Sequence, residues 1–252
     1  MRPLARPLAL LGLLVAGATI AGLYRSHLQS QLLRADPGAL APHSSLLEFA
    51  VRNGAGIFHS HCAQCHGSQG RGSTSLGVPD LTDSDWLYGE GSVADMERVI
   101  SYGIRSNDPK AWNLARMPAF GRPQTNPPDP NIRPLPAGSI NDVIEYLQSL
   151  QGLPADSRAV ARGAGVFGNT GGCFDCHGAD AKGDAAIGAP NLADHITLYG
   201  DGGRQSLFDS ISFGRRGVCP GWTGKLTPAQ IRETAFYVHS LASSARASQV
   251  TQ

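Results

Sequence analysis

Charged residues make up only 16% of this 252-residue chain, and no Lys- or Arg-rich tract occurs in it. A formal net charge of +1 leaves no electrostatic footprint for a nucleic-acid partner. No segment alternates apolar and polar residues in the way that predicts a β-strand. The acidic residues are scattered, which is typical of a solvated surface and not of paired groups for acid–base catalysis. These absences exclude a nucleic-acid-binding protein and argue against an enzyme that processes an organic substrate.

Methionine is also scarce, with three residues in the chain, of which Met96 and Met117 follow the initiator. The C-terminal half contains none. Cysteine occurs five times, and an odd count leaves at least one thiol outside any internal pairing in an exported protein.

One long apolar run is present near the N-terminus, from Leu8 to Tyr24. Arg2 and Arg6 precede it and Arg25 follows it, a charge pattern that keeps the N-terminus in the cytoplasm and sends the remainder across the membrane. A cleaved signal peptide is the alternative, because residues 16–18 offer a small-residue cleavage site. The apolar character continues past that site, which favours a retained anchor. Both interpretations place the rest of the chain outside the cytoplasm.

The rest of the sequence is a repeat. CAQCHGSQGRG begins at Cys62 and CFDCHGADAKG begins at Cys173, 111 residues later. The same offset aligns residues 76–89 with residues 187–200. The chain therefore contains two copies of one domain.

Apolar residues in each copy recur with helical spacing, as in residues 46–60 and 140–150. Glycine (31) and proline (17) are frequent, which predicts short helices joined by turn-rich loops. We expect an all-α protein with an N-terminal anchor or signal segment over residues 1–34 and tandem domains over residues 46–152 and 153–245.

Each copy carries a C-x-x-C-H motif, formed by Cys62, Cys65 and His66 in the first copy and by Cys173, Cys176 and His177 in the second. Two thiols at this spacing reach the two vinyl groups of a haem, and the adjacent histidine binds the iron. A zinc site or a redox-active cysteine pair would leave the histidine beside each second cysteine unexplained. Two covalently bound c-type haems are therefore predicted.

A histidine-bound haem needs a second axial ligand or keeps an open position. Met117 is the candidate for the first haem, because Met96 falls in a predicted helix and is expected in the core. For the second haem, Gly103 and Pro118 align with Gly214 and Pro220, which places Cys219 at the position of Met117.

Three interpretations of Cys219 stay open. As a thiolate ligand, kept deprotonated by Arg215 and Arg216, it would lower the potential of its haem. As an unligated thiol, it would leave the iron open. In the third interpretation it is a small buried side chain, and the ligand is one of three other residues of the second copy: His195, His239 or Lys225.

The blocks HCAQCHG, PDLTDSDWLYG, MPAFG, CFDCHG and GAPNLADHITLYG together resemble subunit III of cbb3-type cytochrome c oxidases, a family of tandem class I cytochrome c domains. The resemblance covers nearly all of the chain beyond the apolar segment. It implies that His66 and His177 are proximal ligands and that Met117 is the first distal ligand. It also implies that three aromatic residues lie near the haem propionates: Trp86 and Tyr88 at the first haem, and Tyr199 at the second. The chain departs from the family pattern at Cys219, where the second distal methionine is missing.

The resemblance implies electron relay between redox partners on the periplasmic side of the bacterial inner membrane. The partners would be an oxidase core or other cytochromes. An alternative is an enzyme that oxidises a sulfur compound such as thiosulfate at a cysteine-ligated haem. A redox or gas sensor is a third possibility, which the lack of an output segment disfavours. We expect an electron-transfer subunit more than an independent catalyst.

Overall fold

The computed structural model describes residues 5–123 and 132–250, and it describes the side chains of residues 11–123 and 132–243. Residues 1–4 of the predicted N-terminal segment lie outside the described residues. Within the described part the secondary structure is helical, with isolated β-bridges and no strands. This confirms the all-α prediction. In chain order the elements are α1 (Ala5–Arg34), η1 (Pro37–Ala39), α2 (Ser45–His61), α3 (Ala63–His66), α4 (Val93–Tyr102), α5 (Ala137–Leu150), α6 (Ser157–Gly165), η2 (Val166–Thr170), α7 (Phe174–His177), α8 (Arg204–Phe213) and α9 (Pro228–Val250).

Helices α2, α4 and α6 begin at side chains that cap their free backbone N–H groups. Ser44 caps α2 by accepting a hydrogen bond from the Leu47 N–H, and Asp156 caps α6 by accepting one from the Ala159 N–H. At α4, Ser92 and Asp95 form a reciprocal capping box. These caps fix where each helix starts, and so they fix which face of the helix turns inward.

Two separate hydrophobic cores result. The first buries Leu32, Ala50, Phe58, Val93, Met96, Ala235, Phe236 and Val238. The second buries Phe120, Ile140, Val143, Ile144, Leu147, Phe167, Ala181 and Ile211. Each core therefore draws residues from both sequence repeats.

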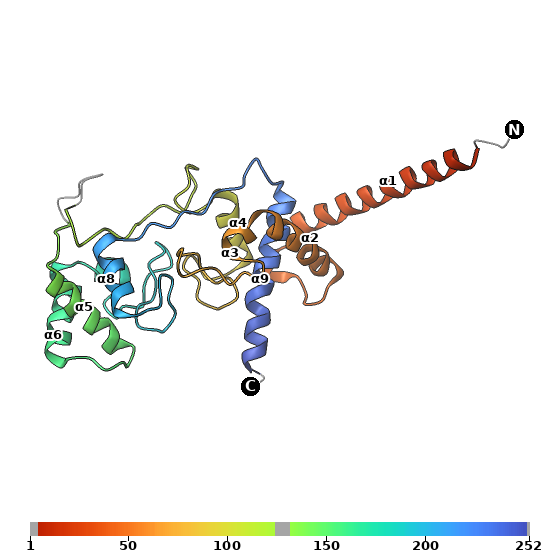
Figure 1. Ribbon diagram of the computed structural model, residues 1–252. Helices are drawn as coiled ribbons and strands as arrows, with labels where there is room; N and C mark the ends of the chain where they lie inside the picture. Colours follow the sequence, from red (N-terminus) through yellow and green to blue (C-terminus); the bar gives the residue numbers. More distant parts are fainter. Residues whose placement is uncertain (1–4, 124–131, 251–252) are drawn as a thin grey trace.

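The two repeats exchange their last helices. In the first unit, α9 packs along α2 so closely that a Cβ on Gly54 would lie 2.0 Å from the Glu233 carbonyl oxygen. In the second unit, α5 packs along α6, and a Cβ on Gly163 would lie 1.9 Å from the Asp142 carbonyl oxygen. Figure 1 shows the blue helix α9 among the orange and yellow helices of the first repeat. The ranges 46–152 and 153–245 thus remain predicted repeat boundaries, while the packed units combine helices from both.

The chain crosses between the units along two extended segments that pair with each other. Met117 and Arg215 exchange backbone hydrogen bonds of 3.2 Å in both directions. Ile104 and Cys219 do the same at 2.9 and 3.0 Å. In the second repeat, Arg215 occupies the position of Ile104 and Cys219 occupies the position of Met117. The two backbone pairs are therefore related to each other by a pseudo-twofold axis. Each segment carries a candidate distal ligand out of its own repeat.

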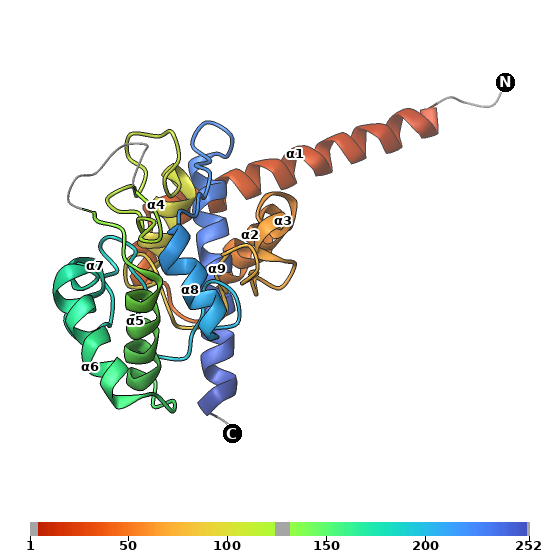
Figure 2. The same ribbon diagram turned by 60° about the vertical axis from the view of Figure 1, so that its left-hand side comes forward.

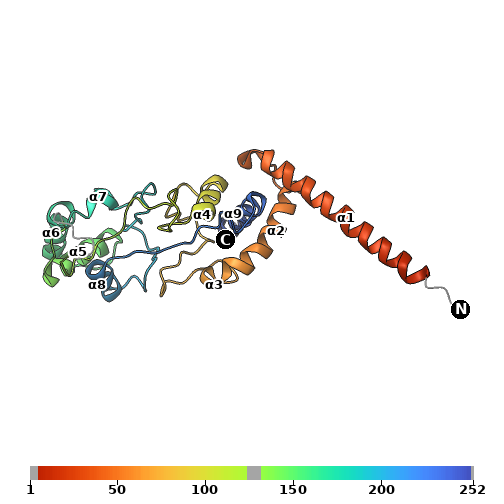
Figure 3. The ribbon, with the colours of Figure 1, turned by 90° about the horizontal axis from the view of Figure 1, so that it is seen from above.

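Helix α1 projects away from both units, as Figures 2 and 3 show from two directions. Its apolar side chains are exposed, with Leu13 at 71% and Leu14 at 72%. Only its C-terminal end is anchored, where Leu32 is fully buried in the first core. By length and apolar character, none of the helices in the described part of the chain is sufficient to cross a bilayer.

Candidate haem sites

The first C-x-x-C-H motif is shaped by a single helical turn. Helix α2 ends at Cys62, whose N–H donates to the Phe58 carbonyl at 2.8 Å. The Cys62 carbonyl then accepts from the N–H groups of Cys65 (3.2 Å) and His66 (3.0 Å). Gly67 ends the turn at a φ of 76°, a conformation that glycine adopts without steric cost. The turn places both thiols and the imidazole on one short element.

The second motif repeats this geometry. The Cys173 carbonyl accepts from the N–H groups of Cys176 (3.3 Å) and His177 (3.0 Å), and Gly178 ends the turn at a φ of 76°. It differs in its approach, because the π-helix η2 replaces the last turn of the preceding α-helix. The two motifs therefore agree in local structure as well as in sequence.

Both motif histidines are oriented through the same ring nitrogen. His66 Nδ1 lies 3.4 Å from the Pro79 carbonyl oxygen, and His177 Nδ1 lies 3.0 Å from the Pro190 carbonyl oxygen. Donation from Nδ1–H leaves Nε2 with the free lone pair that a metal requires. Burial lowers the pKa of both imidazoles, which favours the neutral form that binds iron.

Beside the second motif lies a cavity of about 600 Å³. Cys173, Cys176 and His177 line one part of its wall, and Met117 lines another. Most of the remaining wall is apolar, including side chains of the second core. The volume of this cavity is in the range of cofactor pockets. Its wall offers two thiols, an imidazole and a thioether, a set of groups that fits a covalently bound haem.

Met117 lies beside the second motif, and not beside the first motif that precedes it in the chain. Met117 follows the first motif along the chain, but it lines the cavity of the second motif. The reason is the crossing, since the segment that carries Met117 leaves the first unit after Gly103 and pairs with Arg215. The thioether is therefore available to the second haem.

Cys219 lies correspondingly close to the first motif. Its backbone pairs with Ile104, and its thiol lies in electrostatic range of the thiols of Cys62 and Cys65. Burial raises the pKa of the Cys219 thiol to about 11, and the two neighbouring thiols push the pKa in the same direction. This position makes Cys219 available to the first haem.

Arg215, one of the two basic residues near Cys219, is held by contacts with other side chains. The Arg215 guanidinium lies 4.3 Å from the centroid of the Tyr199 ring, and its Nε donates to the Ser210 hydroxyl. Burial, the main cause of the raised pKa of Cys219, disfavours a thiolate in the protein without haem. A bound metal deprotonates a coordinating thiol outright, so an iron held by Cys219 would itself supply the ionisation.

The three alternative ligands of the second copy lie away from the second cavity. His195 is exposed and does not line it. Lys225 has its ammonium 5.4 Å from the centroid of the Trp222 ring, and it lines a separate surface hollow. His239 belongs to α9, which packs in the first unit. Met117 is better placed at this cavity than any of them.

Aromatic residues join the two units. Tyr88 packs against Gly188 and Tyr199 packs against Gly77, in contacts that leave no room for a Cβ at either glycine. Tyr199 lines the second cavity, as the family resemblance implied.

Sequence reasoning missed the role of Trp112. Its indole N–H donates to the Ala186 carbonyl at 2.7 Å, and its ring lies 5.4 Å from that of Tyr88. Trp112 lies between Gly103 and Pro118, a stretch that is longer than the aligned stretch from Gly214 to Pro220. This extra length was the signal in the sequence that the segment has a role of its own.

Carboxylates also meet between the units. Asp83 and Asp194 occupy equivalent positions in the two repeats and interact electrostatically. Burial is the main cause that raises the pKa of Asp83 from 3.8 to about 6, and Asp80, Asp85 and Asp194 add to it. The junction between the units therefore carries an unfavourable charge near neutral pH.

Replacing Asp83 with asparagine should raise the melting temperature at pH 7. A carboxyl with a raised folded-state pKa stabilises the fold fully below its unfolded pKa, and this contribution is lost as the pH rises through about 6. The increase in melting temperature caused by Asp83→Asn should therefore disappear below about pH 4. Thermal unfolding at pH 4 and pH 7 checks this, with the exposed Glu90→Gln as the control. An equal gain at both pH values would contradict it.

Comparison with known proteins agrees with this architecture. Residues 49–147 and 158–238 match the family described as cytochrome c oxidase, cbb3-type, subunit III. Among curated relatives, the cbb3-type cytochrome c oxidase subunit CcoP of Cereibacter sphaeroides is 36% identical over 85% of this chain and 69% of its own length. CcoP of Rhodobacter capsulatus is 39% identical over 84% of this chain and 69% of its own length. The subunit FixP of a Bradyrhizobium species is 40% identical over 78% of this chain and 62% of its own length.

One solved structure, the Kuenenia stuttgartiensis reducing HAO-like protein complex, is 17% identical over 75% of this chain and 95% of its own, with a TM-score of 0.22. That likeness is too distant to bear on the fold. The family match spans both repeats and both C-x-x-C-H motifs. The chain belongs to the cbb3-type cytochrome c oxidase subunit III family, and it carries two covalently bound c-type haems.

Proposed function

We propose that this protein relays electrons to the core of a cbb3-type oxidase from a donor cytochrome. A bound haem supplies reversible one-electron chemistry at its iron. The observation that carries the proposal is the exchange of helices and crossing segments, which joins the two haem sites into one interlocked body. An interlocked pair of sites suits transfer between haems better than two domains on a flexible linker.

The ligand sets give the relay a direction. His66 and Cys219 would hold the first iron, and His177 and Met117 would hold the second. A thiolate stabilises ferric iron and lowers the potential, whereas a thioether raises it. Electrons would therefore enter at the first site and leave from the second.

Replacing Cys219 with methionine should raise the potential of the first haem. Exchange of an anionic sulfur ligand for a neutral one removes the stabilisation of ferric iron, so we expect an increase on the order of 100 mV within the roughly 0.8 V that axial ligands span. Potentiometric titration of the purified dihaem protein measures it, with Cys219→Ser as a variant that removes the sulfur. An unchanged first potential would rule out ligation by Cys219.

The membrane is the proposed setting. The relatives named above are oxidase subunits, and the exposed apolar side chains of α1 extend from Leu11 to Tyr24. We place α1 at the bacterial inner membrane, with the two haem units on the periplasmic side. Positive charge at Arg2 and Arg6 supports this orientation.

Co-purification with the oxidase core tests the assignment. A tagged chain should bring down a cytochrome c oxidase from membranes, and the complex should consume oxygen with a reduced c-type cytochrome as donor. A chain that stays apart from any oxidase in detergent-solubilised membranes would remove the proposal.

A further inference from the structure

One arginine contacts both crossing segments. Arg105 Nη1 donates to the carbonyl of Ala115 at 3.0 Å, and its Nε donates to the carbonyl of Gly217. Ala115 lies two residues before Met117, and Gly217 lies two residues before Cys219. A single guanidinium thus holds equivalent points on the backbones that present the two distal ligands.

The surroundings of Arg105 fix its position. Its own N–H donates to the Trp112 carbonyl at 3.0 Å, and its φ of 48° is unusual for a residue with a side chain. Such a conformation persists where surrounding contacts determine it. Its guanidinium carbon lies 5.8 Å from the centroid of the Tyr88 ring, at the contact between the units.

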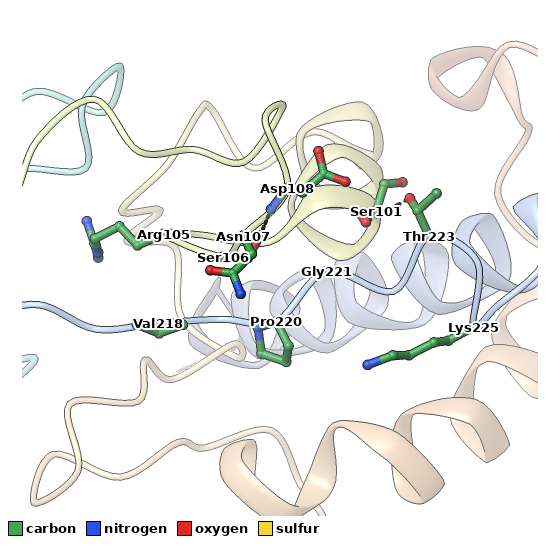
Figure 4. Close-up of a pocket in the computed structure, with 10 residues that line it drawn as sticks. All are labelled: Ser101, Arg105, Ser106, Asn107, Asp108, Val218, Pro220, Gly221, Thr223 and Lys225. Atoms are coloured by element: carbon green, nitrogen blue, oxygen red, sulfur yellow. Dashed lines mark hydrogen bonds between the residues drawn. The ribbon is translucent and has the colours of Figure 1, made fainter.

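Arg105 also lies between two hollows. It lines the cavity of the second motif, and it lines a polar surface hollow of about 380 Å³ with Val218 and Pro220. Figure 4 shows Arg105, from the first repeat, beside the blue segment that carries Val218 and Pro220 on either side of Cys219. The Arg105 side chain therefore lies where a displacement of one distal ligand segment can be transmitted to the other segment.

Among the described residues, the second repeat shows no equivalent clamp. Arg216 occupies the position of Arg105 one repeat later, and it is exposed. In that repeat Arg215 lies over the Tyr199 ring instead and donates to Ser210. The clamp is thus a single asymmetric feature of an otherwise pseudo-symmetric crossing.

We propose that Arg105 is a positioning residue that couples the two distal ligands, so that ligation at one haem and ligation at the other respond together. The proposal rests on the proposed function only in taking Met117 and Cys219 as haem ligands. A planar guanidinium offers several N–H donors in a fixed fork and can bond two carbonyls at once. A lysine keeps the charge but presents its donors from one atom, so Arg105→Lys separates the clamp from the charge.

Hydrogen exchange of the dihaem protein, resolved to peptides, tests the coupling. Arg105→Lys and Arg105→Gln should each speed exchange at the amides of Met117 and Cys219 by about tenfold or more. Arg216→Gln, which removes the same charge nearby, should leave both segments at the wild-type rate. Faster exchange in one of the two segments alone would overturn the proposal. So would a wild-type exchange rate in Arg105→Lys, or an increase in Arg216→Gln as large as that in the Arg105 variants.

A second readout follows the ligand itself. The ferric second haem should lose part of its methionine-ligation absorbance in both Arg105 variants while haem content stays at two per chain. Full retention of that absorbance would overturn the coupling. Both measurements use the isolated chain, so failure to bind an oxidase core would remove the proposed function and leave this result standing.

Discussion

Replacing Met117 with alanine is expected to lower the potential of the second haem and leave that of the first unchanged. Met117 lines the cavity of His177, although it follows the first motif in sequence. Loss of a thioether ligand removes the feature that raises the potential, so the decrease should be on the order of 100 mV or more within the roughly 0.8 V range of axial ligation. Potentiometric titration with spectra of each haem measures it.

Two comparisons make that result specific. Met96 is buried in the first core, so Met96→Leu should change neither potential while removing a methionine. Carbon monoxide should bind the second haem of the Met117→Ala variant, because one axial position has lost its ligand. A decrease in potential confined to the first haem would instead assign Met117 to the first haem, as sequence order suggests.

Replacing Gly54 with alanine is expected to destabilise the first unit by about 3 kcal/mol or more, at the upper end of overpacking effects. The new Cβ would meet the Glu233 carbonyl at 2.0 Å and the Tyr237 Cβ at 2.9 Å, and neither atom is the end of a flexible side chain. Gly56→Ala is a matched control on the same helix, with nothing within 4 Å of its Cβ. That control should stabilise the protein by up to about 1 kcal/mol, since alanine favours helix over glycine.

The helices that lose protection from hydrogen exchange in each glycine variant distinguish exchanged helices from sequential domains. Gly54→Ala should speed hydrogen exchange in α9, which packs on α2, and spare α5. Gly163→Ala should do the reverse, because its Cβ would meet Asp142 of α5 at 1.9 Å. Faster exchange in α5 of the Gly54 variant would contradict the packing described above.

The sequence was sufficient to predict the repeat, the helices and both C-x-x-C-H motifs, because each depends on local pattern. Spacing along the chain determines a helical face, as in residues 46–60 and 140–150. The motif geometry is equally local, since Cys62 and His66 are joined through one helical turn.

The pairing of helices and ligands could not be predicted in the same way. Helices α5 and α9 are equivalent parts of a repeat and each has an apolar face, so the hydrophobic pattern alone does not tell which unit each helix covers. Alignment placed Cys219 opposite Met117 correctly as a position in the repeat. It could not assign either residue to a haem, because that depends on which unit the crossing segment enters.

The most direct test uses two chains that each carry one haem. Cys62→Ser with Cys65→Ser leaves attachment at Cys173 and Cys176, and the reciprocal pair of substitutions leaves it at the first motif. We expect methionine-ligation absorbance in the chain that keeps the second motif, and its loss when Met117→Ala is added. Methionine ligation found only in the chain that keeps the first motif would contradict the crossed assignment.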